Sequence, residues 1–220
     1  MQILCQAELS VSFHAEMVRR RRPLRFATGL PPAYPLLVIF AEWLASDLIL
    51  TAIVLLWARR SKLDLGLRAP VFKRAWPWMA LYVTWCAAEW CAIRWRIFEL
   101  YSVEDSPAWL NELYGFPLPA QLVLLVVTGP VFEELLFRGA MFAALLRHWG
   151  IWVAAIVPSI LWALLHLGYE PWLLASIAGS GVVLAIIRLR SGSLYVPLCL
   201  HAAGNLLVVL DPYSWFAGPA

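Results

Sequence analysis

The feature that most constrains this chain is a series of apolar runs, each about as long as a bilayer is thick. A helix needs about 20 consecutive apolar residues to cross the hydrocarbon core of a membrane. Hydrophobic residues make up 62% of the chain and charged residues 14%, whereas soluble domains have roughly 45–50% apolar and about 25% charged residues. The sequence therefore predicts an all-α, polytopic membrane bundle with about six to eight membrane helices. Six segments carry this prediction: 35–57, 75–93, 117–137, 150–167, 171–188 and 194–210.

The organisation of the chain follows from the same runs and from the charges between them. We expect residues 1–34, which are polar at first and then basic, to be an irregular N-terminal segment, and residues 35–220 to form one membrane-embedded domain. The loop 58–74 carries six Lys or Arg and one Asp, whereas residues 99–112 carry four acids and no base. Because cytoplasmic loops are enriched in Lys and Arg, the basic loop is expected in the cytoplasm together with residues 188–193. The arginines of the N-terminal segment oppose this orientation.

Three charges interrupt an apolar run in the stretch GPVFEELLFRG, residues 129–139. Ionisable groups at membrane depth are costly unless they are paired or hydrated. In a helix, Glu134 and Arg138 are four residues apart and share a face, whereas Glu133 points roughly 100° away. One carboxylate can therefore pair with the arginine while the other stays free, and two such carboxylates can divide the work of a base and an orienting group. A salt bridge that pins two helices is the simpler alternative.

Other acidic residues within the runs have simpler explanations. Glu42 and Asp47 lack a cationic neighbour in the sequence, so interhelical hydrogen bonding or a protonated state explains them better than chemistry. Glu89 has Arg94 nearby, which indicates an ion pair near the membrane surface.

Two further segments place polar side chains inside apolar runs. LWALLHLG sets Trp162 and His166 four residues apart, and LHAAGN does the same for His201 and Asn205. A lone histidine can serve packing, and a lone asparagine can hold two helices together. Buried polar groups need partners, however, and the two glutamates, the arginine, the histidines and the asparagine are most easily satisfied by one another. We therefore expect a single intramembrane site.

The residue types in this set limit the chemistry that the site can perform. The sequence contains no GxSxG, HExxH or phosphate-binding loop. A glutamate base, a histidine and donors for an oxyanion remain, and they favour hydrolysis of an amide by activated water without a covalent intermediate. Imidazole and carboxylate are also zinc ligands, so a metal-dependent reaction stays open, although no spacing here is diagnostic of zinc.

These motifs resemble those of the CPBP family, the intramembrane endopeptidases that include type II CAAX prenyl proteases and bacteriocin-processing or immunity (Abi) proteins. EELLFR fits the EExxxR motif of that family and HAAGN fits its HxxxN motif. LWALLH is similar to its FxxxH motif, with Trp162 where Phe is usual. The resemblance covers about residues 117–210, which form the expected protease-like core, and the three motifs in this order are specific together.

The resemblance implies that hydrolysis is carried by six residues. Glu133 would activate water, with Glu134 as its partner and His166 assisting. Arg138 would hold the glutamates in place. The six expected catalytic residues are Glu133, Glu134, Arg138, His166, His201 and Asn205.

The resemblance also indicates how a substrate would be held. His201 and Asn205 would position water or stabilise the tetrahedral oxyanion, and Trp162 and Phe137 are expected to contact the substrate. The expected substrate is a membrane-associated protein or peptide in a bacterial inner (plasma) membrane, with no nucleic acid partner. No cofactor is expected, with a divalent metal such as zinc as the alternative.

Glu133 and His166 pose a geometric difficulty, because they fall near opposite membrane faces if each of their runs crosses the membrane once. We therefore expect residues 130–149 to re-enter or span the membrane, with the Gly129–Pro130 pair as the break in the helix.

Two other classes of function fit parts of the pattern. A non-catalytic immunity factor or scaffold of the same fold would keep the polar cluster as a clamp. A proton-coupled transporter fits less well, because the polar groups gather in the C-terminal half and the N-terminal half has no corresponding pair of broken segments.

Overall fold

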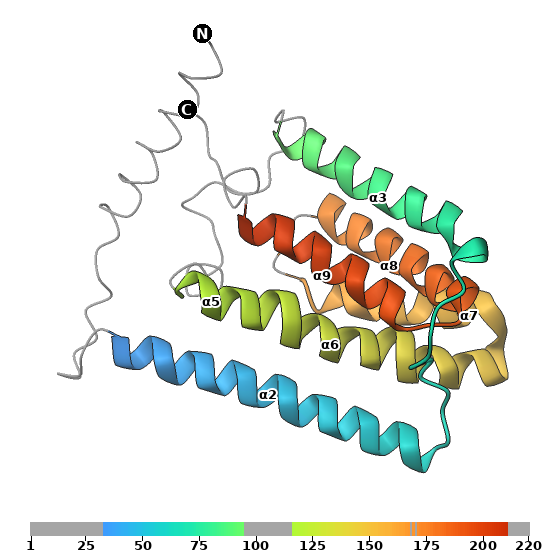
Figure 1. Ribbon diagram of the computed structural model, residues 1–220, viewed down its shortest axis with the longest axis horizontal. Helices are drawn as coiled ribbons and strands as arrows, with labels where there is room; N and C mark the ends of the chain where they lie inside the picture. The colour runs from blue at the N-terminus through green and yellow to red at the C-terminus, as the bar shows by residue number, and fades with distance from the viewer. Residues whose placement is uncertain (1–32, 95–115, 168, 170, 211–220) are drawn as a thin grey trace, which may run out of the picture. The chain divides into compact units, whose positions relative to one another are not determined.

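The computed structural model describes residues 33–94, 116–167, 169 and 171–210 (Figure 1). All regular structure in these residues is helical, which confirms the all-α prediction. The predicted irregular segment before residue 33, the acidic loop 99–112 and the side chain of Arg94 lie outside what is described. The chain divides into two compact units, Met1–Ile39 and Phe40–Ala220, and the second unit contains every contact discussed below.

The described helices match the predicted runs closely in position. Three stretches are long and apolar enough to cross a membrane, namely Leu36–Arg60, Leu118–Leu164 and Pro171–Ser191, and Tyr195–Leu210 is a shorter apolar helix. This is the architecture of a polytopic helical membrane protein, while the number of spans stays a prediction. The elements in chain order are α2 (Ala33–Arg60), α3 (Phe72–Arg94), α5 (Leu118–Gln121), the π-helical η2 (Leu122–Thr128), α6 (Gly129–Glu134), the π-helical η3 (Leu135–Met141), α7 (Phe142–Leu164), α8 (Pro171–Ser191) and α9 (Tyr195–Leu210).

The predicted break at Gly129 and Pro130 is wrong. Both residues are helical and belong to α6, and the helix passes through them without interruption. A wider turn accommodates the proline: the N–H of Gly129 bonds to the carbonyl of Leu124, five residues back. A Cβ on Gly129 would come within 2.9 Å of that carbonyl oxygen, so glycine is what permits the wide turn. Short π-helical turns of this kind are frequent at functional sites.

The chain reverses instead at Gly150, inside the stretch labelled α7. The φ of 79° and ψ of 178° at Gly150 lie in a region that is essentially restricted to glycine. Glu133 precedes Gly150 by seventeen residues and His166 follows it by sixteen. Since a helix rises 1.5 Å per residue, both lie roughly 25 Å from the reversal on antiparallel arms. Glu133 and His166 therefore do not lie near opposite membrane faces, because the first helical arm continues past residue 137 to the reversal at Gly150.

Helix α8 packs against both α7 and α3, and Figure 1 shows these helices running side by side. Two glycines of α8 allow these helices to approach closely. A Cβ on Gly179 would approach the ring of Trp85 to 2.7 Å, and one on Gly181 would approach Ser159 to 2.9 Å. The core on this side of α8 contains Tyr82, Phe137, Trp162, Val183, Leu184, Ile187 and Val196.

Residues 61–71 and 192–194 lie at the same end of the bundle. The amide of Leu194 donates to the carbonyl of Gly66 at 2.8 Å, and the hydroxyl of Ser193 donates to the carbonyl of Arg68 at 2.6 Å. The basic loop and residues 188–193 therefore share one side of the membrane, as the charge pattern requires. That this side is the cytoplasm stays a prediction.

Gly150→Ala should destabilise the protein by about 1–3 kcal/mol, since an alanine at this φ and ψ is strained. No described atom lies within 4 Å of the added Cβ, so the cost would come from the backbone rather than from a clash. Thermal unfolding of the purified protein in detergent measures it. Gly204→Ala is the control, because that helical glycine has ordinary space around its Cβ. Equal stability of both variants would contradict the assigned reversal.

Candidate active site

A fully buried ion pair forms the centre of the site. Arg138 Nη1 donates to Glu134 Oε1 at 2.9 Å, and the two side chains are 1% and 0% exposed. Glu134 and Arg138 are four residues apart in the sequence, and this helical spacing predicts the ion pair. Because separated charges at this burial would cost several kcal/mol, each of the two side chains requires the other.

The guanidinium of Arg138 is enclosed by two neighbouring helices. Its Nη2 atom lies 2.9 Å from the position that a Cβ on Gly181 would take, so α8 can approach only because it has a glycine there. On the other side, Arg138 Cζ stands 4.1 Å from the ring centre of Trp162 on α7, which is a cation–π contact. Of these two charged side chains, Glu134 Oε2 and Arg138 Nε and Nη2 have no hydrogen-bond partner within the described part of the chain.

His201 on α9 joins the two glutamates. Its Nδ1 atom lies 3.0 Å from Glu134 Oε1, and its Nε2 atom lies 3.7 Å from Glu133 Oε2. Since the Glu134 carboxylate is held by Arg138 and accepts hydrogen bonds, we assign the proton of the neutral imidazole to Nδ1. The Nε2 lone pair then faces the oxygen of Glu133.

Trp162 contacts more of the predicted site residues than the sequence indicates. Its indole Nε1 donates to Glu133 Oε2 at 2.5 Å. Its ring also meets those of His166 and His201 edge-on, with centroids 5.6 and 5.1 Å apart. From the sequence, Trp162 is predicted only as a replacement for phenylalanine and as a substrate contact, and its hydrogen bond to Glu133 is not predicted. The signal was available, because an indole has an N–H donor and a phenyl ring has none.

His166 reaches the glutamates only through Trp162 in this arrangement. Its Nδ1 atom lies 2.9 Å from the carbonyl oxygen of Trp162, one turn back on α7, and its ring stacks on Tyr169. The structure thus brings His166 to the edge of the site. Its assisting role in catalysis stays a prediction.

Asn205 lies one turn beyond His201 and binds the backbone of the helix that carries the glutamates. Its Nδ2 donates to the carbonyl of Leu125 at 2.8 Å. The residues that follow cannot serve that carbonyl in the usual way, because Gly129 bonds to Leu124 and Pro130 has no N–H. Asn205 therefore compensates for the proline in the helix. Its predicted role at an oxyanion is untested.

Phe137 and Trp162, predicted to contact the substrate, both belong to the buried core beside α8, where Phe137 is 3% exposed. Substrate contact by either residue stays a prediction. The isolated acids within the runs find other partners. Asp47 accepts a hydrogen bond from Thr128 Oγ1 at 2.7 Å, as the interhelical interpretation requires, and Glu89 forms a hydrogen bond with Ser176.

Accessibility separates the two glutamates. The side chain of Glu133 is 23% exposed, whereas those of Glu134, Arg138 and His201 are at most 6% exposed. Among these four groups, Glu133 is therefore the one that a reactant can reach. The buried side chains of Glu134, Arg138 and His201 form part of the protein surroundings of Glu133.

The donor set does not fit a zinc ion. No cluster of three His, Cys, Asp or Glu with suitable geometry occurs in the described residues. Glu133 Oε2 and His201 Nε2 face each other, but Glu134 is committed to Arg138, and a guanidinium beside a cation is unfavourable. Zinc sites in proteins usually have three or four protein ligands, which this arrangement does not offer.

Comparison with known proteins finds a family-model match in the C-terminal half of the chain. Residues 115–207 match the family model described as type II CAAX prenyl endopeptidase Rce1-like. An Escherichia coli protein named "Uncharacterized 24.3 kDa protein" is 33% identical over 92 residues, 40% of this chain and 42% of its own length. "Putative membrane peptidase YdiL" of Bacillus subtilis is 26% identical over 107 residues, 49% of this chain and 42% of its own length. The chain thus covers less than half of either relative, and no solved structure matches it significantly.

Glu134→Ala should destabilise the protein by about 3–5 kcal/mol, because it leaves Arg138 charged and unpaired in the interior. Adding Arg138→Met to Glu134→Ala should recover much of this loss, since the uncompensated charge is then gone. Unfolding in detergent of the wild type, both single variants and the double variant gives the coupling energy of the pair. A coupling below about 1 kcal/mol, typical of exposed pairs, would contradict the buried pair.

Proposed function

We propose that the protein is an intramembrane endopeptidase, because residues 115–207 match the family model described as type II CAAX prenyl endopeptidase Rce1-like. It hydrolyses a peptide bond near a membrane-associated end of its substrate. The observation that carries the proposal is the state of Glu133: partly exposed, held by the indole of Trp162 and facing Nε2 of His201. The bacterial relatives support a location in a bacterial inner membrane.

Each polar group has a distinct role in this reaction. Glu133 accepts a proton from water while the water oxygen attacks the carbonyl carbon of the scissile bond. The tetrahedral intermediate then collapses, the C–N bond breaks, and the proton passes to the leaving nitrogen. The products are a free carboxylate and a free amine, and no covalent bond to the protein forms.

The buried groups orient this chemistry from behind. Arg138 holds Glu134 by an ion pair, and Glu134 in turn fixes the imidazole of His201 through Nδ1. The Nε2 atom of His201 is thereby presented to the space next to Glu133, where it can hold the attacking water. A carboxylate behind an imidazole performs this orienting work in many hydrolytic sites.

Glu133→Gln should reduce cleavage by about 10²–10⁴-fold, the usual contribution of a general base, while the protein still accumulates in the membrane. Because the substrate is not identified, the measurement is a proteomic comparison of membranes that contain the wild type or the variant, in search of an accumulated precursor. Glu42→Gln is the matched control, since Glu42 is an exposed acid on α2 apart from the site. Unchanged membrane proteomes in all three strains would argue against the protease.

Trp162→Phe should lower kcat by roughly 10–100-fold with little change in KM, because a hydrogen bond to a charged group contributes about 1.5–3 kcal/mol. The substitution keeps an aromatic ring but removes the donor to Glu133. Single-turnover cleavage of a precursor identified in the proteomic comparison separates the two constants. Wild-type kcat in this variant would show that the indole N–H does not position Glu133.

The alternatives remain distinguishable from this proposal. A non-catalytic immunity factor or scaffold of the same fold is expected to function normally with Glu133→Gln, since the amide is nearly isosteric with the carboxylate. In a metal-dependent protease, exhaustive chelation would abolish cleavage. The pairing of Glu134 with Arg138 favours water activation by Glu133 without a metal.

A further inference from the structure

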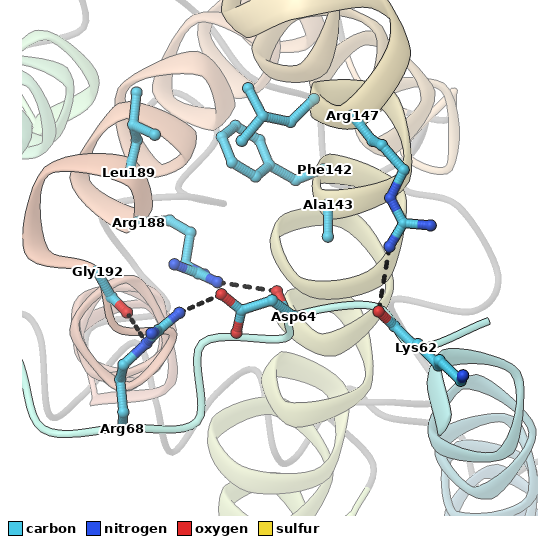
Figure 2. A pocket seen from close by; sticks show the side chains of 10 residues that line it. Lys62, Asp64, Arg68, Phe142, Ala143, Arg147, Arg188, Leu189 and Gly192 are labelled. Carbon is cyan, nitrogen blue, oxygen red and sulfur yellow. Dashed lines mark hydrogen bonds and ion pairs between the residues drawn. The ribbon is translucent and has the colours of Figure 1, made fainter. Parts of the chain in front are cut away.

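A strongly basic pocket lies where the loop 61–71 meets the end of α8 and the start of α7 (Figure 2). Its cavity volume is about 400 Å³. None of the residues that line it belongs to the candidate active site. Its charged lining consists of four cationic side chains and one carboxylate: Lys62, Arg68, Arg147, Arg188 and Asp64.

Arg188 is the side chain that most clearly requires a ligand. The residue is 6% exposed, and its Nε atom is buried without a hydrogen-bond partner among the described residues. Its Nη2 atom donates to the main-chain carbonyl of Asp64 at 3.1 Å. The guanidinium of Arg188 packs directly against Gly66 of the loop, because a Cβ on Gly66 would lie 2.1 Å from the guanidinium carbon. Arg188 thus donates to a neutral carbonyl, and the Asp64 carboxylate, which also interacts with it electrostatically, is shared with Arg68. A buried cation that is compensated in this incomplete way is costly, and an anion in the pocket would compensate it further.

Two more guanidinium groups, both on exposed residues, donate to main-chain carbonyls. Arg68 Nε donates to the carbonyl of Gly192 at 3.0 Å, and Arg147 Nη2 donates to that of Lys62 at 3.1 Å. Figure 2 shows Arg68 reaching toward Gly192 and Asp64 on one side of the pocket and Arg147 turned toward Lys62 on the other. Each keeps further N–H donors for a ligand, since a guanidinium has five.

The single carboxylate of the pocket does not neutralise this charge. Asp64 accepts hydrogen bonds from the amide of Gly66 and from Arg68. Partial burial alone would raise the pKa of Asp64, but the Gly66 amide and the guanidinium groups of Arg68 and Arg188 hold this pKa below its ordinary value. Asp64 is therefore ionised at neutral pH, and the four cations around it leave the pocket with a net positive charge.

The pocket lies at the level where apolar helices end. Both α2 and α8, which are long and apolar enough to cross a membrane, terminate beside it. Phe142, Leu146 and Leu189 form an apolar part of its wall. Further along α7, Trp149 and Trp152 at the reversal are 68% and 67% exposed, and exposed tryptophans are typical of the headgroup layer. The pocket therefore opens where phospholipid headgroups lie.

We propose that this pocket binds the headgroup of an anionic glycerophospholipid. The phosphate lies between Arg188, Arg147 and Arg68, whose forked donors match phosphate oxygens, and the acyl chains follow the apolar wall toward the hydrocarbon. Basic pockets between transmembrane helices are sites of this kind. An acidic peptide would satisfy the charge but would gain nothing from an apolar wall at membrane depth. The site is separate from peptide hydrolysis and does not depend on it.

Thermal unfolding of the full chain in a neutral detergent tests the proposal, with phosphatidylglycerol or phosphatidylcholine added. A ligand that binds the folded state raises the Tm by an amount that increases with its concentration and its affinity. Phosphatidylglycerol should raise the Tm and phosphatidylcholine should not. Arg147→Gln should weaken the apparent affinity for phosphatidylglycerol about fivefold, as expected for one basic residue at an anionic membrane surface. Arg188→Gln should weaken it further, and Arg147 provides the test if that variant does not fold.

Arg190→Gln is the matched control, because it removes the same charge from the last turn of α8 outside the pocket lining. This variant should respond to phosphatidylglycerol like the wild type. Equal effects of Arg190→Gln and Arg147→Gln would overturn the site, as would equal stabilisation by phosphatidylcholine. A Tm rise with inorganic phosphate alone, or with a soluble acidic peptide instead of the lipid, would assign the pocket to that anion and overturn the lipid proposal.

Discussion

The buried ion pair between Glu134 and Arg138 governs the arrangement of the helices around it. A guanidinium without exposure inside an apolar bundle is tolerable only where every surrounding element makes room for it or compensates it. Helix α8 makes room with Gly181, α7 covers the guanidinium with the ring of Trp162, and α9 brings His201 to the carboxylate. The same pair decides which glutamate is available for chemistry. Once Glu134 is committed to Arg138, the partly exposed Glu133 is left to meet a reactant.

The glutamates stand in the middle of an arm that is helical from Leu118 to its reversal at Gly150, and its irregular turns are compensated locally. The wide turn that admits Pro130 leaves the carbonyl of Leu125 to Asn205. Pro130 and Gly150 thus have opposite effects on the helix. The proline distorts the helix without ending it, whereas a glycine with no close neighbours ends it through backbone conformation alone. The reversal sets the level at which the second arm returns, and that level brings Trp162 to Glu133.

The sequence was informative about which residues need partners and less so about which partners they find. Helical periodicity alone predicts that Glu134 pairs with Arg138, and membrane energetics predict that the histidines join them. The break was assigned to Gly129 and Pro130 because proline is the usual helix breaker, while Gly150, between two Trp-containing stretches, carries no signal of its φ value. The motif resemblance considers only the ring shape of Trp162, so the indole N–H that donates to Glu133 is not predicted. Contacts such as that between Asn205 and Leu125 depend on the register between helices, which no local pattern encodes.

The arm that ends at Gly150 connects two polar regions with opposite charge balance. Near its middle, two carboxylates meet one guanidinium and an imidazole, and the buried carboxylate of Glu134 is paired with the guanidinium. One to three turns further on, Phe142 and Arg147 line a pocket in which cations outnumber the carboxylate four to one. A buried charge must be compensated in either region. The first region pairs its buried charges with its own residues and keeps one carboxylate for chemistry. In the second region Arg188 is the buried charge, and the proposed headgroup would compensate it from outside the chain.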